Sequence, residues 1–129
     1  MAGLLAPLTK PRLDRVGGRA WIATAGPRLC DEGAARFAVL VESAVQDGCV
    51  ELVLDLSEVD DIDSTGAIAL CEIEIALTEA GAEVAVAAAH PLVLSTLRSA
   101  QLDLVWPVSA DRETALAGLL AAPVGMQPA

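Results

Sequence analysis

The chain has 129 residues and a mass of 13.2 kDa, which is the size of a single domain. Hydrophobic residues make up 54% of it but aromatic residues only 2%, so the core must be built from Ala, Val, Leu and Ile. The formal net charge of −10 would repel a phosphate backbone, which argues against nucleic-acid binding.

Other sequence features argue against membrane insertion and secretion. No apolar run approaches the about 18–20 residues of a spanning helix, and the N-terminus lacks the basic and apolar regions of a signal peptide. The three cysteines, Cys30, Cys49 and Cys71, form no CxxC pair, so neither a disulfide framework nor a zinc site is indicated. We therefore expect a cytoplasmic domain with reduced thiols and no direct membrane insertion.

Segments with strand and helix periodicity alternate along the chain. Leu8–Val16 and Arg19–Ala25 predict two strands joined at Gly17-Gly18, because both glycines accept the positive φ of a hairpin turn. Asp31 is the expected N-cap of a helix that ends near Gln46. The later expected elements are a central strand Glu51–Leu56, a helix from Ser64–Gly66 to Gly81, a buried strand Glu83–Ala89, a helix Pro91–Ala100, a short strand Leu102–Val105 and a helix Asp111–Leu120 capped by Asp111. This alternation predicts an α/β fold with at least partly parallel pairing, over residues 8–121, between tails at 1–7 and 122–129.

The segment Leu52–Leu70 places acidic and hydroxyl side chains in a turn between the central strand and the next helix. A hydroxyl in the first turn of a helix caps free backbone N–H groups, and capping by Ser64 and Thr65 is enough to explain the pattern by itself. A phosphate on Ser64 would gain the same donors but would place about two negative charges beside Asp61 and Asp63. Such a charge would alter the surface more than the fold, which suits a switch for partner binding.

This segment resembles the signature of the STAS domain, the fold of bacterial anti-sigma factor antagonists and of the cytoplasmic tail of SulP anion transporters. The family pattern, D-L-S-x-V followed after two residues by I-D-S-S/T-G, stands here as Asp55–Val59 and Ile62–Gly66. Downstream, Gly81, the strand Val84–Ala89 and the stretch HPLVLSTLRSAQLD fit the same family. The resemblance covers almost the whole chain. It implies a single STAS domain, in which a mixed sheet of four to five strands packs with about four helices.

The resemblance implies a regulatory binding protein rather than an enzyme. In anti-sigma factor antagonists, a kinase-type anti-sigma factor phosphorylates the serine directly after the aspartate, which here is Ser64, with Thr65 as a second candidate acceptor. The dephosphorylated antagonist binds the kinase and frees its sigma factor, and phosphorylation ends that binding. We therefore expect a phosphoprotein of transcription regulation with an anti-sigma factor kinase as partner. Ser64→Ala is expected to cost about 1 kcal/mol through a lost cap.

An apolar stripe on the helix after Gly66 is the expected partner-binding surface. Ile68, Cys71 and Ile75 lie about 200° around the helix from the stripe that would pack on the sheet. The alternative is that a neighbouring helix covers this second stripe. Besides these three residues, the expected partner-binding set includes Asp31, Asp61, Asp63 and Gly66.

Two departures from the antagonist pattern favour another function within the family. The stretch Gly26–Gly33 followed by Phe37 is closer to the SulP-type pattern than to the G-E-L-D-x-x-T of many antagonists. In addition, Gly66–Leu70 stands where antagonists usually carry G-L-G. The alternative function is a SulP-type STAS interaction domain associated with anion transport and not switched by phosphorylation.

Other site chemistries find little support in the sequence. Asp60–Asp63 clusters carboxylates without further ligands at loop-site spacing, so no metal or other cofactor is expected. His90 is the only histidine, and no G-x-S-x-G elbow accompanies it, which argues against a catalytic relay. Conventional nucleotide motifs are missing, and weak nucleotide binding is left open only by the resemblance. Cys71 is expected to serve as a small hydrophobic residue, with redox regulation as the alternative.

Overall fold

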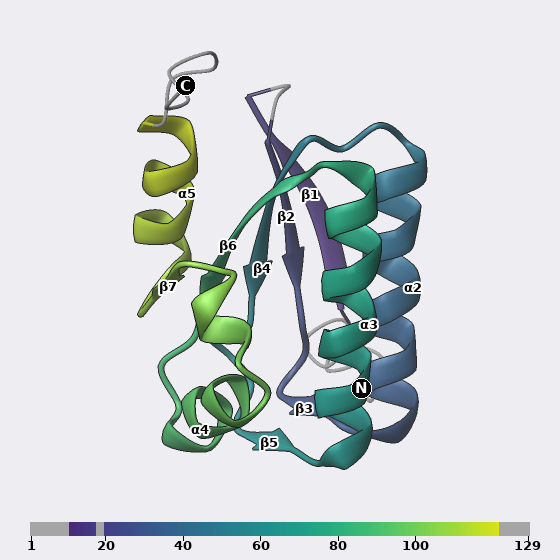
Figure 1. The fold of residues 1–129 in the computed structure, drawn as a ribbon, viewed down its shortest axis with the longest axis vertical. Coiled ribbons are helices and arrows are strands. Elements are labelled where there is room, and N and C mark those ends of the chain that lie inside the picture. Colours follow the sequence, from purple (N-terminus) through teal and green to yellow (C-terminus); the bar gives the residue numbers. More distant parts are fainter. Residues whose placement is uncertain (1–10, 18–19, 122–129) are drawn as a thin grey trace, which may run out of the picture.

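The computed structural model describes residues 11–17 and 20–121, which form a sheet flanked by helices (Figure 1). The main sheet has five strands in the order β1–β2–β4–β6–β7. β1 is antiparallel to β2, whereas the other neighbours pair in parallel. The strands are β1 (Arg12–Val16), β2 (Ala20–Thr24), β4 (Glu51–Asp55), β6 (Glu83–Ala87) and β7 (Val108–Ser109). The predicted α/β class and the mixed sheet are thereby confirmed.

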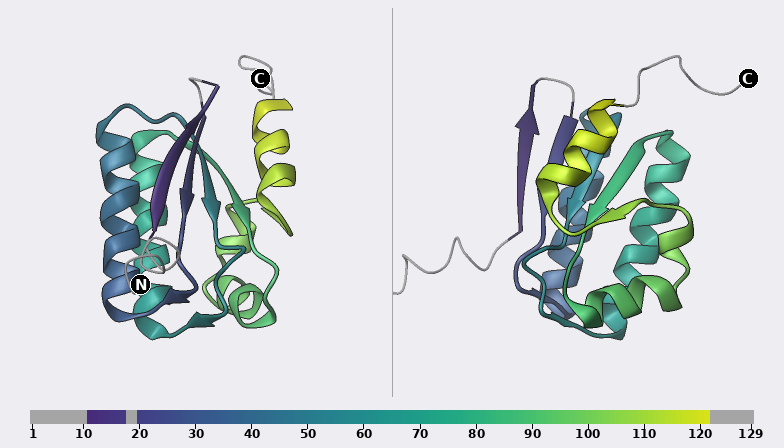
Figure 2. Two further views of the ribbon diagram at one scale, coloured as in Figure 1. Left: turned by 180° about the vertical axis from the view of Figure 1, so that it is seen from behind. Right: turned by 90° about the vertical axis from the view of Figure 1, so that its left-hand side faces the viewer.

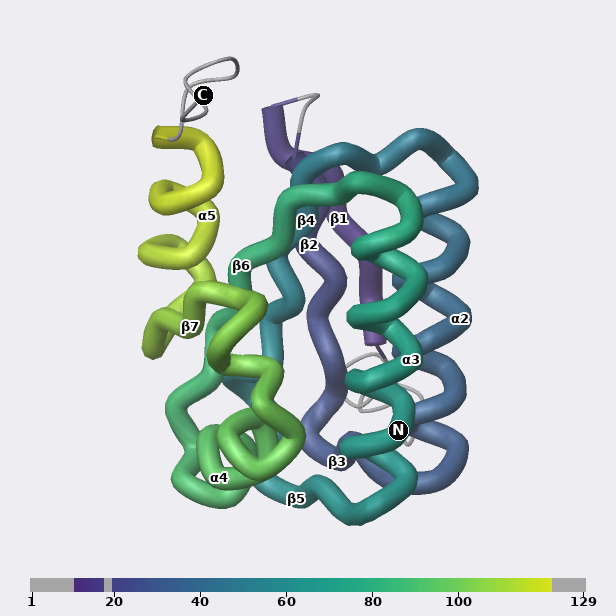
Figure 3. Tube along the Cα trace, viewed as in Figure 1, coloured from purple at the N-terminus to yellow at the C-terminus, as the bar shows by residue number. Residues whose placement is uncertain are grey.

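A second, two-stranded sheet pairs β3 (Arg28–Leu29) in parallel with β5 (Asp61–Ile62) beyond the carboxyl ends of β2 and β4. Because β3 leads into α2 and β5 into α3, this small sheet brings the starts of the two long helices together (Figure 3). The helices are α2 (Asp31–Gln46), α3 (Ser64–Ala80), α4 (Pro91–Ser99), the 3₁₀ helix η2 (Leu102–Leu104) and α5 (Arg112–Ala121).

The core has two parts because successive strand residues point to opposite faces of the sheet. Figure 2 shows α2 and α3 on one side of the sheet and α5 on the other. The row that faces the larger core, on the side of α2 and α3, contains Trp21, Leu52 and Val84, and the next row faces α5 with Ile22, Val53 and Ala85. Central strand β4 is buried along its whole length, as its nearly continuous apolar sequence predicts.

One predicted strand, Leu102–Val105, is wrong. The backbone N–H of Trp106 donates to the Leu102 carbonyl at 2.9 Å, so this segment closes into η2 and a turn instead of extending. Gln101, with φ 61, reverses the chain just before it. The last strand of the sheet is therefore Val108–Ser109, which comes after Pro107.

The remaining predicted elements agree with the structure to within one or two residues in the region that it describes. The helix predicted to stop at Gly81 does so, with Gly81 in the left-handed conformation at φ 71. The predicted cap of α5 is also confirmed, since Asp111 Oδ1 accepts from the Thr114 N–H at 2.7 Å. Residues 8–10 of the first predicted strand, Gly18-Arg19 and both predicted tails lie outside the described residues. Within residues 11–17 and 20–121, no helix is both long and apolar enough to cross a membrane.

Candidate functional site

The turn before α3 is organised by Asp63, which is the N-cap of this helix. Its backbone is extended, and its Oδ1 atom accepts from the backbone N–H groups of Thr65 at 3.0 Å and Gly66 at 3.2 Å. The expectation that Ser64 or Thr65 caps the helix is therefore wrong. Because Ser64 does not cap α3, Ser64→Ala should cost far less than a lost cap.

The two neighbouring hydroxyl groups have opposite environments. Thr65 Oγ1 donates to Asp63 Oδ1 at 2.5 Å and accepts from the backbone N–H of Asp31 at 2.7 Å. The Thr65 hydroxyl thus ties the start of α3 to the start of α2, 34 residues away in sequence. The side chain of Ser64 is exposed and makes no hydrogen bond to any described residue. Of the two candidate acceptors, Ser64 therefore has the free hydroxyl.

Asp31 contributes to the site in a different way from the one expected. Its side chain caps nothing, because the N-cap of α2 is Cys30, which makes no capping hydrogen bond through its side chain. Asp31 is instead the first helical residue, with φ 48, and its N–H points to Thr65. A tertiary hydrogen bond thus holds this residue in the left-handed region, which local sequence pattern could not reveal.

Gly66 is required by a close approach between α3 and β3. A Cβ atom at this position would collide with the carbonyl oxygen of Leu29 and would lie 2.8 Å from Ile62 Cγ1. Since Gly66 is buried, it positions the first turn of α3 but offers no side chain to a partner. Gly33 has a related role in α2, because a Cβ there would lie 2.6 Å from the Arg28 carbonyl oxygen.

The site is strongly acidic around the free serine. The carboxylates of Asp31, Asp61 and Asp63 come from the starts of α2, β5 and α3, and the cation Arg28 pairs with Asp61 at 3.4 Å. That pair is exposed and therefore contributes little. Burial, followed by the charges of Asp61 and Asp63, raises the pKa of the Cys30 thiol, so this cysteine stays protonated at neutral pH. In residues 11–17 and 20–121, no group of three or more acidic, histidine or cysteine side chains could hold a metal ion.

The hydroxyl of Thr65 sets the acidity of Asp63. Its hydrogen bond, and next the Gly66 N–H, lower the pKa of the Asp63 carboxyl below its ordinary value. The ionised cap therefore stabilises the fold at neutral pH, and this contribution is lost as the pH falls through the pKa of the folded state. We expect Thr65→Val to raise this pKa toward the ordinary value in an NMR titration of the Asp63 carboxyl. Ser64→Ala is the matched control and should leave it unchanged; equal values in all three proteins would contradict the hydrogen-bond assignment.

Two hollows flank the first turn of α3. One, of about 360 Å³, lies between this turn and α4 and is lined by Asp63, Ser64, Ser95, Thr96, Ser99 and two alanines. The other, of about 210 Å³, lies between α2 and α3 and is lined by Asp31, Thr65, Ile68, Glu72 and four alanines. The sequence did not predict that α4 contributes hydroxyl groups beside Ser64. Ser95 and Ser99 share one face of that helix, but only the tertiary structure shows which element this face meets.

The apolar stripe on α3 is only partly covered. Ile68 is 58% exposed and Ile75 is 55% exposed, so no described helix covers them, and the alternative of a covering helix is wrong for these two residues. Cys71, between them, is half-buried and packs against the larger core. On α2, Val39 adds a further apolar side chain that is 65% exposed. Exposed apolar side chains therefore lie on both long helices. Those on α3 lie within about three turns of Ser64.

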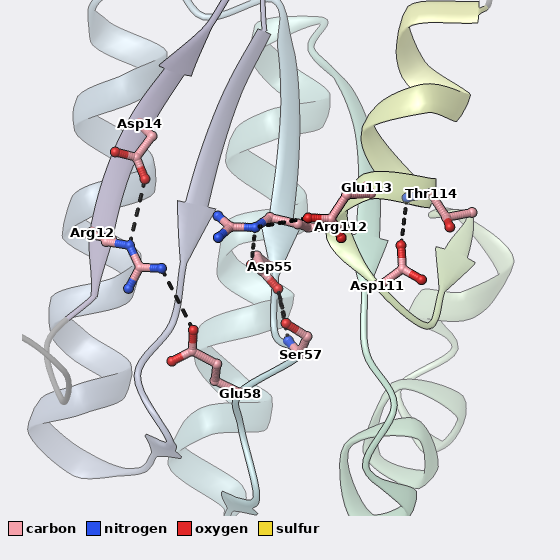
Figure 4. Close-up of polar contacts among 9 residues, drawn as sticks. All are labelled: Arg12, Asp14, Asp55, Ser57, Glu58, Asp111, Arg112, Glu113 and Thr114. Atoms are coloured by element: carbon pink, nitrogen blue, oxygen red, sulfur yellow. Dashed lines mark hydrogen bonds and ion pairs between the residues drawn. The ribbon is translucent and has the colours of Figure 1, made fainter.

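Asp55, the first residue of the family pattern, lies away from this surface and has a structural role. Its side chain is 2% exposed, and its Oδ1 atom accepts from Ser57 through the backbone N–H at 3.0 Å and the hydroxyl at 2.5 Å (Figure 4). Its Oδ2 atom lies 3.7 Å from Nε of Arg112 at the start of α5. Asp55 thus joins the central strand to the helix on the other face of the sheet.

The mixed sheet, the two long helices that start together and the aspartate-capped serine turn define an α/β domain of the STAS type. The family model for the STAS domain matches residues 12–115, so the chain belongs to the STAS domain family. No curated protein matches the chain in sequence.

Solved structures share this fold at low sequence identity. An anti-sigma factor antagonist from Mycobacterium paratuberculosis superposes with a TM-score of 0.73 and 21% identity, over 86% of this chain and 93% of that one. The anti-sigma factor antagonist SpoIIAA in its unphosphorylated form gives 0.73 and 11%, over 88% of this chain and 98% of that one. The murine solute carrier 26 family member A9 anion transporter in the inward-facing state gives 0.64 and 17%, over 93% of this chain and 24% of the transporter.

Proposed function

We propose that this STAS domain is an anti-sigma factor antagonist that binds a serine-kinase anti-sigma factor and is released by phosphorylation of Ser64. The single observation that carries the proposal is the contrast between the two hydroxyls of the turn. Ser64 is exposed and its hydroxyl bonds to none of the described residues, whereas the Thr65 hydroxyl already donates to Asp63 and accepts from Asp31. A kinase can reach the first without breaking any contact of the fold. The role needs no catalysis by this domain and implies a cytoplasmic location.

A phosphate on Ser64 would change the surface that a partner meets. In an α-helix, residues four apart lie one above the other, so Ser64 shares a face of α3 with Ile68. About two added negative charges would stand beside that exposed apolar side chain and beside Asp63. A partner surface that packs on Ile68 would lose this contact, because the phosphate adds bulk and a strongly hydrated charge beside the apolar side chain. Phosphorylation therefore acts on binding, while the fold keeps its Asp63 cap.

Phosphorylation of Thr65 would have a different consequence. Its hydroxyl would lose the proton that it donates to Asp63, and a phosphate would sit against that carboxylate. The bond from Asp31 that holds α2 to α3 would be disturbed as well. Modification of Thr65 should thus loosen the fold, which makes Ser64 the better switch.

The proposal is tested by mapping phosphate on protein purified from its native cells during growth and during stress. Trypsin is unsuitable because no Lys or Arg lies between Arg36 and Arg98, but cleavage after Glu58 and Glu72 yields a short peptide that contains both hydroxyls. We expect phosphate on Ser64 and none on Thr65. For the anti-sigma factor kinase, Ser64→Ala should keep binding and Ser64→Asp should weaken it by more than tenfold. Equal binding of the two variants would contradict the switch.

The fold of the anion transporter supports a second candidate function. The structural match covers 24% of the transporter chain. Phe37, which occupies the last position of the SulP-type pattern, is fully buried in the larger core. A SulP-type interaction domain needs no phosphate on Ser64. A peptide that stays unmodified under growth and stress alike would favour this second function.

A further inference from the structure

The described residues cover only half of the edge of the main sheet beyond β6. β7 has two residues and pairs with Val86 and Ala87 at the C-terminal half of β6. If the register of β6 and β7 continued toward the start of β6, the next hydrogen bond would run from the backbone N–H of residue 107 to the carbonyl oxygen of Val84. Residue 107 is proline, which has no N–H to donate, so the ladder stops there. No strand of the described residues stands opposite Val84.

The backbone of Val84 faces this open edge. In a parallel sheet, successive residues of an inner strand bond to opposite neighbours. The N–H of Glu83 donates to Val50 on the β4 side, whereas the N–H of Val86 donates to Pro107 on the β7 side. By this alternation, the N–H and C=O of Val84 point away from β4. No described strand pairs with these groups, and Val84 is 8% exposed, so one more strand could be added only at this short stretch of edge.

A groove of about 610 Å³ runs along this edge between α3 and α5. Figure 1 shows the N-terminal part of β6 between these two helices, and the right-hand view of Figure 2 looks onto the edge. Most of the lining is apolar, and the larger apolar side chains are Leu77, Val84, Val105, Trp106 and Leu119. Val105 is 56% exposed, whereas the other four side chains are buried, so the apolar surface that the described residues leave open to an occupant is mainly that of Val105.

The charge of the groove restricts what can bind there. Glu74 and Glu83 line it, and among the residues that the structure describes no Lys, Arg or His does. The whole chain carries a formal net charge of −10, which adds to the attraction for a cation. An occupant therefore needs apolar side chains for the walls, basic side chains for the rim and main-chain groups for the edge.

We propose that this groove binds a short extended peptide segment of a partner protein, with apolar side chains at its centre and basic side chains at its ends, which adds as a strand to β6 at Val84. The segment would continue the line of β7 and would lie between α3 and α5. Glu74, on the groove, is ten residues from Ser64 along α3, which is about 15 Å. The groove is thus a second protein-binding surface, and it does not depend on the serine switch.

The experiment is an NMR titration of the ¹⁵N-labelled full chain with a capped six-residue peptide that has Lys at each end and four Val residues between. We expect saturable shifts of the Val84 and Ala85 amides and of the Trp106 indole, together with slower hydrogen exchange of the Val84 amide. Replacement of each Lys by Glu, or N-methylation of the central amides, should weaken binding at least tenfold. Equal binding of the N-methylated peptide would overturn strand addition, because that peptide keeps the apolar side chains.

Gly118 of α5 allows a matched pair of variants. It lines the groove, and a Cβ at this position would meet nothing within 4 Å. Gly118→Leu should fill the groove and abolish peptide binding, whereas Gly118→Ala should retain it; both should keep the fold, since each removes a glycine from a helix interior. Undiminished binding by Gly118→Leu would overturn the proposal.

Chemical shifts of the Val84 amide that depend on protein concentration in the absence of peptide would also overturn it, because a second copy of the chain would then fill the groove. Ser64→Asp should bind the peptide normally, so this test and that of the serine switch can fail separately.

Discussion

Gly66→Ala is expected to lower the free energy of unfolding by about 2–3 kcal/mol, at the upper end of the range for overpacking. The new Cβ would collide with the backbone carbonyl of Leu29, which belongs to β3 and cannot move away by changing a rotamer. Either β3 or the start of α3 must shift, and that shift would strain the Asp63 cap and the bond between Thr65 and Asp31. Urea denaturation monitored by circular dichroism measures the loss.

Gly118→Ala is the control for this prediction. Both glycines lie in helices, but an alanine Cβ at 118 has open space around it. Alanine is favoured over glycine in a helix interior by up to about 1 kcal/mol, so Gly118→Ala should raise stability. The two substitutions should thus have opposite signs. If both stabilise the protein, the close approach of α3 to β3 does not restrict residue 66 in solution.

Arg112→Met is expected to destabilise the domain by about 2 kcal/mol. It leaves the carboxylate of Asp55, whose side chain is 2% exposed, without its cation. Removal of one partner from a buried pair costs about 3–5 kcal/mol. We expect less here because Arg112 is 36% exposed and Ser57 continues to donate two hydrogen bonds to Asp55. A double-mutant cycle with Asp55→Asn should recover part of the loss, since the neutral amide needs no cation.

Arg12→Met is the matched control in the same region of the molecule (Figure 4). Arg12 lies 3.7 Å from Asp14 and 3.7 Å from Glu58, close to the spacing of the Arg112 pair, but all three side chains are more than 40% exposed. Its loss should change stability by less than about 1 kcal/mol. A similar cost for the two arginine variants would show that burial of Asp55 does not set the strength of its ion pair.

Much of the fold was predictable because its signals are local. The helix over Ser64–Ala80 has a polar start, an apolar stripe toward the sheet and a left-handed glycine at its end, all visible within a short stretch of chain. The Gly17 turn and the nearly continuous apolar run of β4 are local in the same sense. The wrongly predicted strand at Leu102–Val105 is short and apolar except for Asp103, and in such segments helical and extended conformations are hardest to tell apart by pattern.

The sequence by itself determined the family, the α/β class, the place of the serine turn and its acidic surroundings. Only the tertiary structure decided which hydroxyl is free, because the partner that occupies Thr65 is the backbone of Asp31, 34 residues earlier. It also decided that Gly66 packs against Leu29 and that no described strand covers the N-terminal half of β6, beside a mostly apolar groove with two glutamates. These features depend on contacts between distant segments. Periodicity and turn chemistry report only how residues close in sequence behave, so these patterns could not reveal contacts between distant segments.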